Sequence, residues 1–294
     1  MSNYILATDS CIDLNQTMAD ELGLEVIPLS VLVEDKVYFN YLDGRDILPH
    51  DFYQLIRERK KTSTSQVSTR EFISFFKPFL EENKDILYIA FSSALSGTYH
   101  SAMQAQSELK KKYPNNKLIV VDSLCASMGQ GLLVTYASRL KQEGKSIEEV
   151  AKWLEDNKTN VCHLFTVGDL DQLKRGGRLS ATTAFIGNLL SIKPLLHVSL
   201  EGKLVQAGKV YGRKRSLDAL VELMVNSIVD AEGQTVYISH GDCYEDALYV
   251  KEKIKAALPV GNIIINYVGP VIGSHSGVGT LAIFYMGKER YLEK

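Results

Sequence analysis

The sequence lacks the features that would build a disulfide framework, a zinc site, a membrane span or a nucleic-acid-binding surface. Its four cysteines form no Cys-x-x-Cys pair, so we expect reduced core thiols and neither a metal nor a cofactor. A formal net charge of −2 argues against nucleic-acid binding, which needs surplus cations to replace phosphate counterions. No run approaches the roughly 18 apolar residues that span a bilayer, and the first residues show no signal peptide. Together these observations predict a cytoplasmic protein.

What the sequence does contain is typical of a globular chain. Of its 294 residues, 45% are hydrophobic and 23% are charged. This length suggests about two domains and a core large enough to leave room for an internal ligand cavity.

The first part of the chain alternates between short β-branched runs and amphipathic stretches. Such alternation predicts an α/β domain over residues 1–160, with a mostly parallel sheet flanked by helices. Ser68 and Glu71 form a capping-box pattern, so one helix is expected to begin there. The expected strands are residues 4–8, 26–33, 85–91 and 117–122.

The second part, residues 161–294, has a different pattern. Residues 193–212 predict two strands joined by a short Glu-Gly-Lys turn, which makes part of this region antiparallel. An amphipathic stretch at 215–230 predicts a helix, and the glycine-rich end at 271–287 becomes strand-like. We therefore expect a second, mixed α/β domain that contains antiparallel strands.

Hydroxyl side chains follow several of the expected strands. The segments "ATDS", "FSSALSGT" and "VVDS" each end a strand, and "TSTSQVS" (62–68) reads as a hydroxyl-rich loop before the capped helix. The carboxyl ends of parallel strands meet at one sheet edge, where ligands of open α/β sheets bind. Hydroxyls and helix-start amides there would suit an anionic oxygen group. Serine and threonine also cap helices and fill turns without any ligand, and both interpretations stay open.

Catalytic motifs match poorly. The stretch "ALSGT" is a loose version of a nucleophile elbow, because Ala94 and Thr98 stand where glycines are required. A serine hydrolase or a small-substrate kinase remains an alternative that would use the same hydroxyl loops. The segment "GVGTLA" (277–282) cannot be a dinucleotide loop, because no full βαβ unit follows it.

Two basic clusters and one histidine allow several roles. "KRGGR" (174–178) and "GRKR" (212–215) could meet an anionic partner or a phosphate, or could simply be solvated surface. His275, within "VIGSHSGVG", could be a base, a donor to an anion or a core histidine.

Taken together, these segments resemble the DegV family of fatty-acid-binding proteins, which includes the binding subunit of bacterial fatty acid kinase. The resemblance covers nearly the whole chain. One departure is Val67, which stands where the family commonly has proline. The motifs that carry the resemblance are "ATDSCIDL", "TSQVS", "FSSALSGTYHSA", "VVDSLCASMGQG", "LKRGGRLS" and "GPVIGSHSGVG".

The resemblance implies a protein that is not itself an enzyme. It would hold one long-chain fatty acid, such as a C14–C18 acid, and present the carboxylate to an ATP-dependent kinase subunit. The acyl phosphate formed would enter phospholipid synthesis, and transient contact with a membrane is compatible with this role. The implied carboxylate contacts are Thr64 and Ser96, with Ser93, the amide of Gly97 and His275 as helpers. The implied kinase contacts are Arg175 and Arg178.

The energies of burial and hydrogen bonding agree with separate roles for an apolar tail site and a polar carboxylate site. About fifteen methylenes at roughly 0.8 kcal/mol each give on the order of 12 kcal/mol on burial, much of which is lost in ordering the ligand. Tail burial should therefore supply affinity, while neutral hydroxyls orient the carboxylate without a strong ion pair. Further apolar lining is expected from residues 182–196, although an ordinary core helix would explain this segment equally well.

Overall fold

The computed structural model describes residues 4–179 and 191–290, except for the side chain of Asp171. It confirms the α/β class, with one parallel sheet flanked by helices and one mixed sheet that contains antiparallel strands. The parallel sheet has the strand order β2-β1-β6-β7. Its strands are β1 Tyr4–Asp9, β2 Leu24–Ile27, β6 Asp85–Ala90 and β7 Leu118–Asp122.

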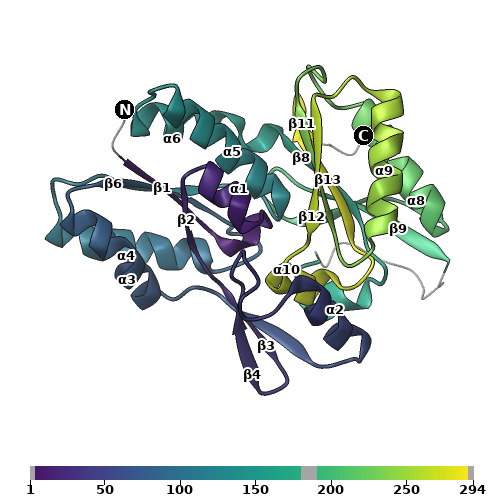
Figure 1. Ribbon diagram of the computed structural model, residues 1–294, viewed down its shortest axis with the longest axis horizontal. Coiled ribbons are helices and arrows are strands. Elements are labelled where there is room, and N and C mark those ends of the chain that lie inside the picture. The colour runs from purple at the N-terminus through teal and green to yellow at the C-terminus, as the bar shows by residue number, and fades with distance from the viewer. Residues whose placement is uncertain (1–3, 180–190, 291–294) are drawn as a thin grey trace.

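Helices cover both faces of the parallel sheet. They are α1 Gln16–Glu21, α3 Thr69–Glu81, α4 Thr98–Lys112, α5 Met128–Gln142 and α6 Ile147–Asn157. Figure 1 shows α5 and α6 above the sheet and α3 and α4 below it. Because both faces are covered, the central strand β6 is apolar and almost entirely buried rather than alternating. The expected capping box of Ser68 and Glu71 is present at the start of α3.

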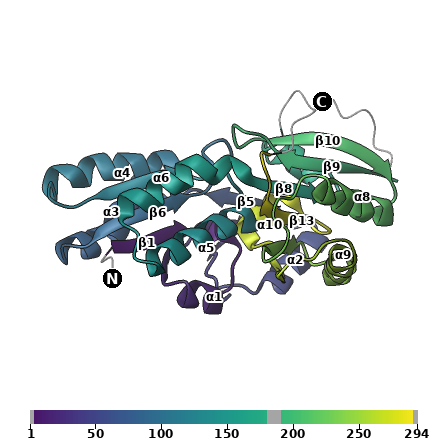
Figure 2. The ribbon, with the colours of Figure 1, turned by 90° about the horizontal axis from the view of Figure 1, so that it is seen from above.

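The mixed sheet has the order β10-β9-β8-β13-β11-β12, and its only parallel pair among the described strands is β11–β12. The hairpin expected at 193–212 is confirmed as β9 and β10. Helices α8 Arg213–Val225 and α9 Tyr244–Ala257 pack on this sheet, and α5 contacts it as well as the parallel sheet (Figure 2). The strands are β8 Val161–Thr166, β9 Ile192–Val198, β10 Leu204–Tyr211, β11 Thr235–His240, β12 Asn262–Tyr267 and β13 Leu281–Met286.

The expectation of a single strand at 26–33 was wrong. The structure divides this run into β2 and β3 (Ser30–Val33), which belong to different sheets. Pro28 lies between them, and a proline cannot donate the backbone hydrogen bond that a continuous strand would need. Strand β3 is central in a small antiparallel sheet with β4 Lys36–Phe39 and β5 Thr62–Ser65. The hydroxyl-rich stretch at 62–68 is therefore a strand over its first four residues, and only its remainder is loop.

Several short helices were not expected from the sequence. Helix α2 (Pro49–Arg57) begins with a proline and packs Phe52 and Tyr53 against β3 in a small separate core. The glycine-rich segment "GPVIGSHSGVG" contains α10 (Pro270–Ser276), and the first basic cluster begins in the last two residues of α7 (Asp171–Arg175). The remaining short elements are the 3₁₀ turns η1 Ser10–Ile12 and η2 Lys158–Asn160.

The boundary at residue 160 stays a prediction. The strands of the parallel sheet end before it and β8 begins at Val161, but one continuous apolar core includes buried residues from both sides. Among the described helices, none is long and apolar enough to cross a membrane.

Candidate functional site: a cavity between the two sheets

A cavity of about 370 Å³ lies where the carboxyl ends of the parallel strands meet the mixed sheet. The segments after β1, β6 and β7 form one side, and strands β8, β9, β10 and β13 form the other. Most of the wall is apolar, as the expected tail site requires. The apolar lining comprises Leu29, Phe91, Leu95, Ala126, Phe165, Leu173, Val198, Leu204, Val268, Val271, Ile272, Ala282 and Phe284, together with the Cys11 thiol.

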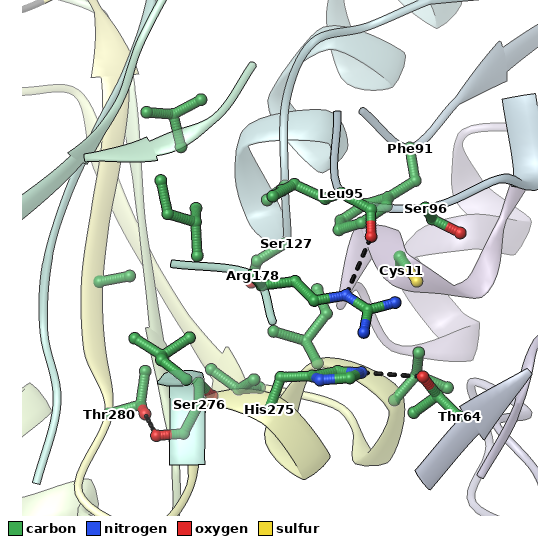
Figure 3. Close-up of a pocket in the computed structure, with 18 of the residues that line it drawn as sticks. Cys11, Thr64, Phe91, Leu95, Ser96, Ser127, Arg178, His275, Ser276 and Thr280 are labelled. Atoms are coloured by element: carbon green, nitrogen blue, oxygen red, sulfur yellow. Dashed lines mark hydrogen bonds between the residues drawn. The ribbon is translucent and has the colours of Figure 1, made fainter. Parts of the chain in front are cut away.

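Thr64 and His275 meet at one end of the cavity, which we call the mouth. Thr64 is on β5 and His275 is on α10, and a hydrogen bond of 2.8 Å joins Thr64 Oγ1 to His275 Nε2 (Figure 3). Burial, and secondarily the charge of Arg178, lower the pKa of His275 to about 4. The imidazole is therefore neutral at pH 7, and it contributes a hydrogen bond rather than a charge.

Ser96 and Gly97 lie in the turn between β6 and α4, and both line the cavity. Ser96 Oγ is 2.9 Å from Thr98 Oγ1 and accepts a hydrogen bond from the Thr98 amide. A Cβ at position 97 would lie 2.0 Å from Gln66 Oε1, so this glycine leaves room for the present position of the Gln66 side chain on the β5–α3 loop. The two hydroxyl segments are thus brought together, as expected from the sequence.

Arg178 also lies at the mouth, although the sequence had suggested a surface role for it. Its Nε donates to the Leu95 carbonyl at 3.2 Å, and Figure 3 shows the guanidinium between the side chains of Ser96 and His275. The chain reaches this position through Gly177, whose φ of +67° few other residues adopt. A Cβ at Gly176 would lie 2.4 Å from His275 Nδ1, so this glycine also permits close packing. The expectation of neutral donors alone is therefore incomplete, because a cation stands beside them.

Ser93 and Arg175 are not brought into the cavity. The Ser93 amide donates to Asp122 Oδ1 at 3.1 Å, and Ser93 is absent from the described lining residues. Arg175 is exposed and lines a neighbouring depression of about 790 Å³, which we call the basic groove. The groove is lined by Ile56, Arg57, Arg59, Lys60, Lys61, Thr62, Ser63, Thr64, Asp169, Gln172, Arg175, Gly176, Arg178, Ser274, His275, Gly277 and Val278.

Sequence reasoning missed the polar groups in the cavity wall. His163 on β8 is buried, with Nδ1 3.0 Å from the Val161 carbonyl and Nε2 accepting from the Ala126 amide. Burial lowers its pKa well below the usual value, so this histidine is neutral and its polar atoms are already paired. Its position on a strand gave no signal, because a histidine in a buried strand is compatible with any core. Ser127, Ser239, Ser276 and Thr280 also contribute to the wall.

Three other expectations concern single segments. Apolar lining was expected from residues 182–196. Residues 182–190 lie outside the described residues, and residues 191–196 are not among the described lining residues, although Val198 at the end of β9 is. Val67 is 2% exposed and packs in the main core. In the second basic cluster, Arg213 forms an ion pair with Asp246 at 2.9 Å, which is a structural role.

A family model described as "Uncharacterised protein, DegV family" matches residues 5–288. The chain belongs to the DegV family. This confirms the resemblance drawn from the sequence motifs.

Other DegV proteins are similar to this chain over nearly its whole length. A DegV domain-containing protein of Clostridium perfringens is 45% identical over 98% of this chain and 98% of its own. A solved structure of a DegV protein from Thermus thermophilus, described by its fatty acid binding, is 31% identical with a TM-score of 0.88. That likeness covers 97% of this chain and 99% of the other. DegV of Bacillus subtilis, described as a fatty acid binding protein, is 30% identical with a TM-score of 0.84 over 98% of this chain and 100% of the other.

Proposed function

We propose that this chain binds one long-chain fatty acid, with the tail in the cavity and the carboxylate at the mouth. The observation that carries this proposal is a mostly apolar cavity at whose mouth Thr64, Ser96, Arg178 and His275 come together. The DegV relatives from Thermus thermophilus and Bacillus subtilis, both described as fatty-acid-binding, support it.

The mouth offers several complementary groups to a carboxylate. Thr64 and Ser96 carry hydroxyls, His275 is neutral, and Arg178 places a fixed positive charge near them. A hydrogen bond to a charged group contributes about 1.5–3 kcal/mol. Two or three such bonds would fix which end of the ligand faces outward, while the apolar wall supplies most of the affinity.

We further propose that the chain acts without catalysing a reaction itself. It would present the bound carboxylate to a separate ATP-dependent kinase subunit, and the acyl phosphate would then enter phospholipid synthesis. Support comes from the position of the mouth, since Thr64, Arg178 and His275 line both the cavity and the basic groove outside it. A carboxylate held by these residues would face a depression that opens outward.

A serine hydrolase, the main alternative, is less well supported by the geometry. A serine nucleophile needs a hydrogen bond to its base. His275 instead pairs with the hydroxyl of Thr64, and the Ser96 hydroxyl is bonded to Thr98.

Mass spectrometry of an organic extract of the purified protein tests the proposal. We expect about one C14–C18 acid per chain, and esterase assays on the same sample should show no turnover. A protein that yields no acid, cannot be loaded with one and hydrolyses esters would contradict fatty acid binding and favour the hydrolase.

A further inference from the structure

The basic groove lies directly outside the mouth of the cavity. It shares Thr64, Arg178 and His275 with the cavity, so a group that approaches the proposed carboxylate position from the groove reaches these residues first. Its volume of about 790 Å³ exceeds that of the cavity, which is about 370 Å³. The groove is therefore large enough for a ligand of its own.

The charge of this groove is strongly one-sided. Six of its described lining residues are arginine or lysine, whereas one, Asp169, is acidic. Arg57 is already in an ion pair with Asp242. Three of the others, Arg59, Lys60 and Lys61, come from the turn between α2 and β5. The remaining two are Arg175, the last residue of α7, and Arg178, which follows that helix.

The turn that carries three of these cations is held in place. The Glu34 amide donates to the Lys61 carbonyl at 2.9 Å, and the Lys61 amide donates to Glu34 Oε1 at 2.8 Å. Arg59 has a φ of +61°, a backbone conformation that fixes the direction of the turn. Arg59, Lys60 and Lys61 are all exposed, so their cations are presented by an anchored backbone.

We propose that the basic groove binds a ligand that carries several phosphate groups. Cations that line a hollow reinforce one another's field, and arginine pairs with phosphate oxygens through two parallel hydrogen bonds. A hollow fits a narrow chain of phosphates, whereas a flat anionic membrane would touch only its rim. This inference rests on the proposed function, under which the ligand is the nucleoside triphosphate of the kinase subunit.

The position of the groove matches the chemistry of that transfer. A carboxylate oxygen at the mouth attacks the terminal phosphorus, and the bond from this phosphorus to the bridging oxygen breaks. The electron pair leaves with the nucleoside diphosphate, and an acyl phosphate remains. Negative charge then spreads over the phosphoryl oxygens, which fixed cations stabilise.

Calorimetric titration of the full-length protein with inorganic tripolyphosphate tests the groove directly. We expect binding that weakens as salt rises, because exposed charges are screened. The triple variant Arg59→Ala, Lys60→Ala, Lys61→Ala should bind about tenfold more weakly, given the usual worth of exposed ion pairs. A matched control is Lys110→Ala, Lys111→Ala, Lys112→Ala, which removes three cations from the last turn of α4. This control should bind tripolyphosphate as the parent does.

Three results would overturn the inference. The first is the absence of tripolyphosphate binding at low salt, and the second is an equal loss of affinity in both triple variants. The third concerns membranes. If the turn variant loses binding to phosphatidylglycerol vesicles but keeps tripolyphosphate affinity, the groove is a membrane contact and the inference is wrong. Fatty acid content distinguishes a failure of this inference from a failure of the proposed function, because the organic extract of the turn variant should still contain the acid. If the parent protein contains no fatty acid but binds tripolyphosphate through the turn, fatty acid binding is refuted while phosphate binding in the basic groove stands.

Discussion

The mouth and the interior of the cavity are built from different kinds of structure. The mouth joins side chains from β5, the β6–α4 turn, the segment after α7, and α10, which are short segments far apart in the sequence. The interior is lined mainly by apolar side chains at the strand ends of one sheet and on the strands of the other. The interior is thus an opening in an ordinary core, whereas the mouth depends on a few exact contacts. Changes in the two regions should therefore have different consequences.

The largest effect is expected from filling the interior. Ala282 on β13 lines the cavity and lies opposite Phe165 on β8, so Ala282→Phe would place a ring in the space proposed for the tail. We expect almost complete loss of bound acid, with a stability cost of about 1–3 kcal/mol from overpacking. The acid-to-protein ratio of an organic extract measures the loss. Ala94→Phe is the control, because Ala94 is exposed and absent from the described lining residues, and normal acid content in both variants would place the tail elsewhere.

Removing the charge at the mouth should have the next largest effect. Arg178→Gln keeps a donor near the Leu95 carbonyl but removes the cation beside Thr64 and His275. We expect fatty acid affinity to fall by about tenfold or more, the worth of one charge-assisted hydrogen bond. Competition with a fluorescent fatty acid would measure this. Unchanged affinity in Arg178→Gln would leave Arg178 as a kinase contact only.

Lowering the pH should reduce the stability of the folded protein through His275. Its pKa is about 4 in the folded chain against an ordinary 6.5, so the unfolded state binds the proton first as pH falls. Stability is therefore lost as pH falls from about 6.5 towards 4, by on the order of 3 kcal/mol for this group. Urea unfolding at several pH values should show a shallower loss in His275→Gln. Thr64→Val keeps the imidazole and should retain the parent slope, while an equal slope in all three proteins would contradict the argument.

The smallest effect is expected at Ser93. Its side chain is not among the described cavity residues, and the contact that places this residue is made by its backbone amide. Ser93→Ala should leave acid content unchanged and alter stability by no more than about 0.5 kcal/mol. Extract analysis and thermal unfolding would check both. Lost acid in this variant would restore the helper role that the family resemblance implied.

Much of the parallel sheet could be predicted from local sequence. Continuous apolar runs and the Ser68–Glu71 box indicate strands and a helix start directly, because burial and capping act over a few residues. The split at Pro28 and the strand character of Thr62–Ser65 were missed. Four consecutive hydroxyl residues form a strand there because β3 supplies the pairing partner, and such pairing is a tertiary effect.

Residues of the site could be predicted only where they belong to a motif of the family. Thr64 and His275 are 211 residues apart, so no spacing rule connects them. The direction of Arg178 depends on Gly177 at positive φ and on the Leu95 carbonyl, which becomes visible only once the chain is folded. The paired glycines were the one available signal that this arginine sits on an unusual backbone.

Helix α5 has a consequence for how the molecule holds together. It contacts β1 and β6 of the parallel sheet as well as β8, β11 and β13 of the mixed sheet, so a single helix in the main core joins the two sheets. A chain cut after residue 160 would expose to water the surface of α5 that contacts the mixed sheet, although ten residues of α5 are buried in the intact protein. We therefore expect the two sheets to unfold in one cooperative transition, with this helix as the part they have in common.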